Sequence, residues 1–406
     1  MNTMSEDRKK ALKELIKQLH AGAPPQEVKE RFRHVLEGIS SEEIAKIENE
    51  LVKEGMPREE IQRLCDVHLA VFREQLEKQK SEIPLGHPIG ILMEEHKIML
   101  QLAEKLATTA NKVQQMNDAS YASEEIHHLE HIARDFIDSE KHYLREENVL
   151  FPIIEKHGIT EPPAIMWMEH NQIREKKKQL NNLIEKYNAA SFQDFKKQLD
   201  ETTKALNSLL PSHFFKENNI LFPTALQVVT EQEWREVRGE FDEIGYCCFT
   251  PSNLTAAPQA KETEKASAPE VVLQFETGSL SKEEVEAILN ALPVDISFVD
   301  KDDAVKYFNK AEKRIFVRTK AVIGRKVQLC HPQKSVHIVD KILEAFKTGK
   351  KDVAEFWITV NNRLIHIRYF AVRDKNGKYL GTMEVTQDLT DIKKIEGQKR
   401  LLDWEA

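Results

Sequence analysis

Two places in the chain combine a histidine with a glutamate four residues later. His142 precedes Glu146, and His213 precedes Glu217. Side chains four residues apart project from the same face of an α-helix, so each pair can present an imidazole and a carboxylate to one site. Imidazole suits iron, zinc and copper, and a carboxylate is a natural bridge between two hard cations. The spacing therefore predicts transition-metal binding.

Both pairs belong to an internal repeat. The segment 142–152 matches the segment 213–223, and each copy ends in Leu-Phe-Pro. Upstream, a run Met-Glu-Glu-His that ends at His96 matches a run Met-Glu-His that ends at His170. Two similar helical hairpins would form a bundle with pseudo-twofold symmetry. We expect its core to hold four histidines and two glutamates, namely His96, His142, Glu146, His170, His213 and Glu217.

This ligand set predicts a pair of metal ions. Two ions bridged by both glutamates, each bound by two histidines, would leave open coordination positions for a small molecule. We expect two iron ions held by neutral histidines and ionised glutamates, with zinc as a substitute in recombinant material.

The repeated pattern resembles the hemerythrin HHE family over residues 86–228. The resemblance implies a hemerythrin-like four-helix bundle, a non-haem di-iron centre on the six residues named above, and O₂ or NO as the diatomic ligand. One position departs from the family pattern. Hemerythrins that carry oxygen have a second histidine four residues after the one that corresponds to His170, and Arg174 stands there instead. The remaining set is more similar to the branch that repairs iron–sulfur clusters and responds to nitric oxide.

Two further histidines are candidates for the missing ligand. His87 lies nine residues before His96, which places it on the opposite face of an uninterrupted helix. His131 shares a face with His142 but lies about 16 Å away along the helix axis, at roughly 1.5 Å per residue. Both are additional candidates that we rank behind the six.

Composition shifts along the 406 residues, which predicts a multidomain chain. Helix formers dominate the front, whereas aromatic and β-branched residues gather in the rear, so we expect an all-α front and a mixed α/β rear. The net charge of −8 argues against a nucleic-acid partner. No apolar stretch suits a membrane helix or a signal peptide. The four cysteines include no Cys-x-x-Cys motif. We therefore expect a cytoplasmic protein with no membrane partner.

Residues 1–82 predict a small helical domain, with a last helix over 58–80. The run Glu-Gly-Met-Pro at 54–57, followed by Leu64 and His68, resembles domain of unknown function 438, which commonly precedes a hemerythrin-like domain. Residues 229–283 predict a helix and then a flexible linker, because 250–283 has little apolar content.

From residue 284 the pattern changes to short strands and helices. A helix is predicted to start at Asn309 and a hairpin turn to lie at 374–377. The segment that begins Phe308-Asn309, the glycine at Gly381 and the run at 388–390 resemble the PAS family. The resemblance implies an α+β PAS domain over 284–391, which binds an organic cofactor of unknown identity or forms a homodimer. Residues 392–406 predict a tail helix.

The rear domain also contains residue types that bind haem iron or other metals. Cys330, His331 and His337 supply a thiol and two imidazoles. Roles in a loop and a helix cap are the more economical interpretation of these three residues.

These features favour a cytoplasmic sensor of O₂, NO or redox state, in which a di-iron centre signals through the PAS domain. No output motif follows the PAS segment, so the signal would pass to an unidentified protein partner. The alternative is a di-iron enzyme or iron donor in nitrosative or oxidative stress, which reduces NO or peroxide or repairs iron–sulfur clusters. A third hypothesis is simple binding of iron or oxygen.

Overall fold

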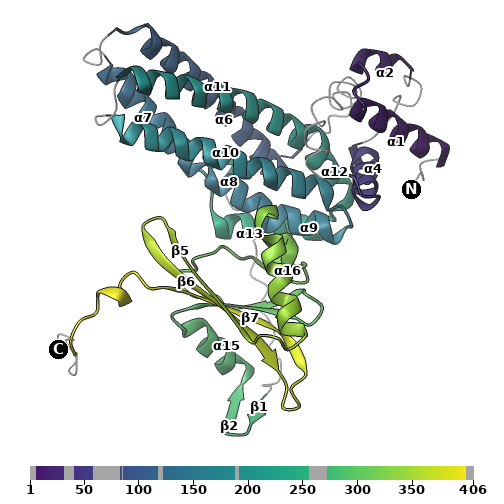
Figure 1. Cartoon of the computed structure of the whole chain (residues 1–406), viewed down its shortest axis with the longest axis vertical. Coiled ribbons are helices and arrows are strands. Elements are labelled where there is room, and N and C mark those ends of the chain that lie inside the picture. The colour runs from purple at the N-terminus through teal and green to yellow at the C-terminus, as the bar shows by residue number, and fades with distance from the viewer. Residues whose placement is uncertain are drawn as a thin grey trace. The chain divides into compact units, whose positions relative to one another are not determined.

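The computed structural model describes residues 6–31, 41–57, 83–84, 86–117, 122–187, 192–255 and 272–398. The chain divides into two compact units, Met1–Gln259 and Ala260–Ala406. The first unit is helical throughout its described residues, and the second is built around a β-sheet (Figure 1). This arrangement confirms the multidomain prediction of an all-α front followed by an α+β domain.

Four long helices form the bundle of the first unit: α6 (Pro88–Gln115), α7 (Ser123–Asp138), α10 (Glu161–Glu185) and α11 (Phe192–Lys216). Helices α6 and α10 each pack against both α7 and α11, as Figure 1 shows. Their apolar faces meet in one core, to which each helix contributes a wholly buried leucine: Leu106, Leu129, Leu180 and Leu206. Burial of such side chains stabilises a bundle by roughly 1.5–3 kcal/mol each.

Two helical segments, which we call arms, carry the His-x-x-x-Glu pairs, and each changes helical register at its glutamate. After Ser139, α7 continues as α8 (Glu140–Arg145), the π-helical turn η3 (Glu146–Leu150) and α9 (Phe151–Lys156). In the other arm, α11 is followed by the π-helical turn η5 (Glu217–Leu221) and α12 (Phe222–Val228).

The repeated sequence explains both π-helical turns. Pro152 and Pro223 are the second residues after the turns. A proline has no N–H to donate to the carbonyl four residues earlier, and its ring clashes with that carbonyl. The side-chain amides of Asn148 and Asn219 donate hydrogen bonds to the carbonyls of Leu144 and Phe215, at 3.0 and 2.7 Å. The same residues thus open the helix and satisfy part of its backbone in both copies.

Other helices cover the glutamate-bearing end of the bundle. Helix α13 (Glu231–Ile244) begins with a capping box of Thr230 and Glu233 and packs against α6, α8 and η3. The four-residue helix α14 (Ser252–Thr255) follows it. These elements occupy the first part of the segment predicted as helix and linker.

The N-terminal module contains α1 (Glu6–His20), α2 (Pro25–Arg31) and α4 (Ser41–Lys53). Its Asn49 caps the start of α10, because the side-chain oxygen accepts from the backbone N–H of Glu161 at 3.0 Å. The module therefore docks onto the bundle. The helix predicted over 58–80 lies outside the described residues.

The second unit has a five-stranded antiparallel sheet in the order β4-β3-β7-β6-β5. Its strands are β3 (Asp295–Asp300), β4 (Val305–Phe308), β5 (Val353–Val360), β6 (Arg363–Arg373) and β7 (Tyr379–Asp388). Helix α15 (Lys282–Ala291) precedes the sheet, and α16 (Gln333–Lys347) packs against β7. Gly381 lies in β7 opposite Asp300, where a Cβ would come within 2.2 Å of the Val299 carbonyl. Only glycine fits this close approach of two strands.

Two details of the second unit differ from the sequence-based expectations. Residues 272–281, expected in the linker, form a hairpin of β1 (Val272–Phe275) and β2 (Gly278–Ser281). No helix starts at Asn309, because its buried side chain is hydrogen-bonded to the segments around β3. Its amide oxygen accepts from Ile296 N, and its amide nitrogen donates to the carbonyls of Leu289 and Val294. The short 3₁₀ turn η8 (Ile392–Lys394) lies in the predicted tail, and residues 399–406 lie outside the described part.

Candidate metal centre

The six predicted ligands lie together in the bundle core, and each side chain is at most 1% exposed. The histidines come from α6, α8, α10 and α11, in that order His96, His142, His170 and His213. Glu146 and Glu217 are the first residues of the two π-helical turns.

The inner atoms of these side chains form two groups. The first group contains His96, His142, Glu146 and Glu217, and the second contains His170, His213 and Glu217, with the ligand atoms of each group within 4.8 Å of one another. Glu217 spans both groups: Oε2 lies 3.1 Å from His96 Nε2, and Oε1 lies 3.1 Å from His213 Nε2. Glu146 Oε2 lies 3.4 Å from Nε2 of both His142 and His170. Each carboxylate therefore faces a histidine of each group, as a bridging ligand must.

Every histidine of the centre is anchored through its outer ring nitrogen, Nδ1. Three of these nitrogens meet carboxylates: His142 meets Glu95 at 2.7 Å, His170 meets Glu147 at 2.9 Å and His213 meets Glu169 at 2.9 Å. The fourth, in His96, meets the amide oxygen of Asn218 at 3.0 Å. These oxygens accept hydrogen bonds, so Nδ1 donates, and a neutral ring then presents the Nε2 lone pair to the centre.

Cations balance the three anchoring carboxylates. Arg145 Nη2 lies 2.6 Å from Glu95, Lys216 Nζ lies 2.6 Å from Glu169, and Arg174 Nη1 lies 2.7 Å from Glu147. Burial alone would raise the pKa of Glu95, but the hydrogen bond with His142 and the Arg145 charge outweigh burial and lower the pKa to about 2. The outer residues are therefore charged, paired and fixed in position.

Several inner atoms have no hydrogen-bond partner among the described residues: both carboxylate oxygens of Glu146, Oε2 of Glu217 and Nε2 of His213. Leaving a buried polar group unsatisfied costs about 1–3 kcal/mol, and more for a charged one. Two metal ions would satisfy these atoms. The donor set of neutral imidazoles and carboxylates fits iron or zinc, so the residues present fit the metals that the sequence predicts.

Electrostatics of the second group also favour positive charge. Burial opposes it, yet the nearby carboxylates of Glu146, Glu147 and Glu217 raise the pKa of His170 well above its ordinary value. Burial would likewise raise the pKa of Glu217, but His213 and His170 hold it well below its ordinary value. The carboxylates of this group therefore favour positive charge at the site.

Arg174 occupies the position at which oxygen-carrying hemerythrins have another histidine. It is held away from the centre by Glu140, at 2.7 Å from Nη2, and by Glu147. The missing ligand is thus replaced by an arginine that supports the outer residues.

The two additional candidates lie elsewhere. His87 is the N-cap of α6, so it precedes the helix, and its Nδ1 accepts from Ile89 N at 3.2 Å. His131 Nε2 lies 3.1 Å from His127 Nε2, and both histidines are exposed. Neither belongs to the two groups found among the described residues.

Sequence reasoning missed the anchoring residues. Glu95 and Glu169 directly precede His96 and His170 in both copies of the repeat, and this repeated Glu-His pair was the available signal. Glu147 and Asn218 are also equivalent in the repeat, but they differ in type. Glu147 and Asn218 are directed toward the centre because they lie in the π-helical turns.

The metal-ligand candidates of the second unit are dispersed. Cys330 is buried, and its Sγ contacts the Lys326 carbonyl at 3.8 Å. His331 lines a cavity, whereas His337 lies on α16 outside that lining. These three residues do not form a metal site in the described part of the chain.

The fold and site together define a helical bundle with a buried group of histidines and glutamates, followed by an α+β domain. Family models identify the parts: residues 87–225 match the hemerythrin HHE cation binding domain, and residues 285–390 match a PAS domain. Residues 12–78 match the family of unknown function DUF438. The chain therefore combines these three domains, as its sequence patterns predicted.

Solved structures give further similarities. A C-terminal domain from Streptococcus mutans has 34% identity and a TM-score of 0.30, over 31% of this chain and 98% of that chain. A PAS domain from Colwellia psychrerythraea has 16% identity and a TM-score of 0.22, over 27% and 97%. A sensory box sensor histidine kinase from Vibrio cholerae has 11% identity and a TM-score of 0.21, over 26% and 89%. No curated protein matches the chain.

Within the described ranges, no helix combines the length and apolar character that crossing a bilayer requires.

Proposed function

We propose that the bundle holds two iron ions and that the protein senses O₂, NO or redox state at this centre. The single observation that carries the proposal is a set of wholly buried carboxylate and imidazole atoms that have no hydrogen-bond partner among the described residues. They lie where four anchored imidazoles converge. The combination of a hemerythrin HHE domain with a PAS domain fits a sensor.

In this proposal, the ligand residues have different roles. His142 and His213 are oriented by Glu95 and Glu169, so their Nε2 atoms are ready to bind without rearrangement. Glu217 faces both groups and ties them together. When bound, iron would supply redox change and open coordination positions for a diatomic ligand.

The same geometry suggests how a change at the centre reaches the helices. Each ligand glutamate begins a π-helical turn, and each of those turns leads into a short helix that carries further packing residues. A change in ligation would therefore act on two helical segments at once. Such a displacement can bias the population of a second conformation, which a partner protein or the PAS domain would read.

The test is metal analysis and absorption spectroscopy of protein purified without air, with hydrogen exchange followed in residues 284–391. We expect about two iron ions per chain and altered exchange in this segment when the reduced centre is oxidised. Protein with no stoichiometric transition metal would refute the centre. A clear spectral change with unchanged exchange would refute the coupling and favour the enzyme alternative, which anaerobic turnover of NO or peroxide with a reductant would then test.

A further inference from the structure

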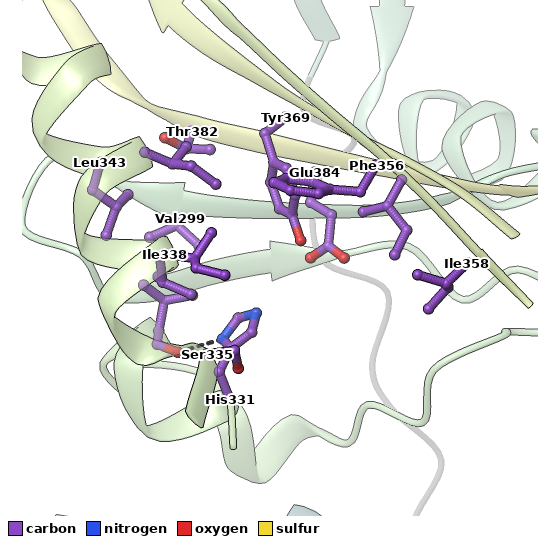
Figure 2. A pocket seen from close by; sticks show the side chains of 14 residues that line it. Val299, His331, Ser335, Ile338, Leu343, Phe356, Ile358, Tyr369, Thr382 and Glu384 are labelled. Carbon is purple, nitrogen blue, oxygen red and sulfur yellow. Dashed lines mark hydrogen bonds between the residues drawn. The ribbon is translucent and has the colours of Figure 1, made fainter. Parts of the chain in front are cut away.

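The PAS domain contains a cavity of about 320 Å³ between its sheet and α16. This volume lies at the lower end of the range for small-molecule sites, roughly 300–1,000 Å³. Apolar side chains of β3, β5, β6 and α16 form most of the wall, as Figure 2 shows. A cavity of this composition suits the apolar body of an organic molecule.

Two polar groups face this space from opposite sides. Figure 2 shows the Glu384 carboxylate reaching down from the sheet and the His331 ring rising from the loop before α16. Glu384 is half-buried in the central strand β7, between Ser297 of β3 and Tyr369 of β6. Alternate residues of a strand share a face, so Glu384 lies on the same side of the sheet as Thr382.

Both groups accept hydrogen bonds. His331 Nδ1 lies 2.9 Å from the Val327 carbonyl, which can only accept, so Nδ1 carries the proton and Nε2 is left as an acceptor. Burial lowers the pKa of His331, which favours this neutral form. Glu384 accepts one hydrogen bond, from Thr386 at 3.3 Å, and forms no ion pair with any described residue.

The serine and threonine hydroxyl groups of the lining have other partners, and the third hydroxyl group of the lining belongs to Tyr369. Ser335 donates to the Pro332 carbonyl at 2.9 Å, and Thr382 is hydrogen-bonded to Tyr379 at 2.8 Å. The lining contains no lysine or arginine. An anionic ligand, or the propionates of a haem, would therefore meet no cationic side chain in the lining itself. The Arg318 charge acts on His331 and Tyr369 from outside the lining. A partly buried carboxylate instead calls for a ligand that donates hydrogen bonds and carries positive charge.

We propose that this cavity binds a small organic cation, whose protonated amine or N-heterocycle donates to Glu384 and His331 while its apolar body fills the space beside α16. The site is separate from the metal centre, so the chain would receive two chemically different inputs.

The test uses the full-length protein and three probes of similar shape: phenylbutylamine, the neutral phenylbutanol and the anionic phenylbutyrate. Calorimetric titration should show the amine binding more tightly than both others. Glu384→Gln keeps the shape but removes the charge, and it should weaken amine binding about ten- to hundredfold. Glu355→Gln is the matched control, because Glu355 lies on β5, bonds His366 and does not line the cavity.

A second variant keeps the proposal testable if Glu384→Gln does not fold. His331→Phe removes the neutral acceptor, so it should weaken amine binding and still leave the amine preferred to phenylbutyrate. Equal binding of amine and phenylbutyrate, unchanged binding in both variants, or binding of Zn²⁺ with none of the three probes would overturn the proposal. Each of these results leaves the iron content of the bundle unaffected, so it is distinct from failure of the proposed sensor.

Discussion

The two groups of the metal centre share the same inner residue types but differ in what lies behind them. In the first group, His96 is anchored by the neutral amide of Asn218; the equivalent residue of the second group, His170, is anchored by the carboxylate of Glu147. A carboxylate partner makes a ligating imidazole more basic than an amide does. The inner ligands thus define a symmetric site, and the outer residues make it asymmetric.

The two groups also differ in the residues that pack beside their histidines. Beside the second group, Lys177 donates to Tyr143 at 2.9 Å, whereas the equivalent positions of the repeat are Ala103 and Phe214. Tyr143 lies against His170, with ring centroids 4.5 Å apart. The two copies of the repeat therefore share their ligands but differ in the residues around them. We expect the two groups to bind their metal ions with unequal affinity.

The largest expected effect tests the shared ligand. Glu217→Ala should lose both metals, because each of its oxygens lies 3.1 Å from a histidine of a different group. Glu146→Ala should retain more metal, because only one oxygen of Glu146 approaches the two groups, at 3.4 Å. The metal-to-protein ratio, measured by mass spectrometry of air-free samples, distinguishes these outcomes. His157→Ala is the control, since His157 pairs with Glu233 outside the centre. Full metal content in Glu217→Ala protein would contradict the bridging role.

Replacing the asymmetric anchor should make the groups alike. Glu147→Gln gives His170 an amide partner, as His96 already has, and we expect the affinity of the tighter site to fall about 10- to 100-fold. Stepwise chelator titration of the loaded protein should then show two similar affinities where the unmodified protein shows two different ones. If the two affinities are already equal before the substitution, the outer asymmetry has no effect on metal binding.

The buried Lys177 predicts a dependence of stability on pH. Burial lowers its pKa to about 7, whereas the unfolded chain keeps an ordinary value near 10.4. The cost of burying the charge is therefore full below about pH 7 and declines as pH rises toward the unfolded value, because only the unfolded state then binds the proton. Lys177→Met should raise the free energy of unfolding more at about pH 6 than at about pH 9.

Denaturant titrations of both proteins in the same metal state measure this difference. Lys178→Met, at a neighbouring exposed position, is the control and should show little change with pH. An advantage of Lys177→Met that stays constant between the two pH values would mean that Lys177 does not titrate as the buried site requires.

The smallest expected effect concerns His87. His87→Ala removes the N-cap of α6, which costs about 0.5–2 kcal/mol at typical caps, and the metal content should not change. A small decrease in Tm with full iron content is the expected result. Loss of one ion would show that His87 binds metal and would add a third source of asymmetry.

The inner ligands could be predicted from the sequence because helical spacing alone brings His142 to Glu146 and His213 to Glu217. The anchors could not be predicted in this way. Regular α-helical geometry rotates by about 100° per residue, so Glu146 and Glu147 should not both face the core. Both are buried because the turn that holds them is π-helical.

The remaining differences have equally local causes. The β1–β2 hairpin escaped prediction because strand β1 is exposed along its whole length and lacks the alternation of a half-buried strand. Asn309 has the residue type of a helix cap, but its tertiary hydrogen bonds to the segments around β3 determine its role. In both cases, long-range or solvent-facing contacts outweigh the local pattern.

The paired π-helical turns also have a consequence for how the arms can move. Each π-helical turn contains about one residue more than an α-helical turn. The position of this extra residue can move along the helix if one backbone hydrogen bond is exchanged at a time, so the helix does not have to unfold. A shift of one residue would rotate the intervening segment by about 100° and slide it about 1.5 Å. Prolines at Pro152 and Pro223 block the route on one side, so the extra residue can travel only back toward the histidines. Each arm can therefore shift in one direction only, toward its histidine. The glutamate is the first residue of the π-helical turn that would move.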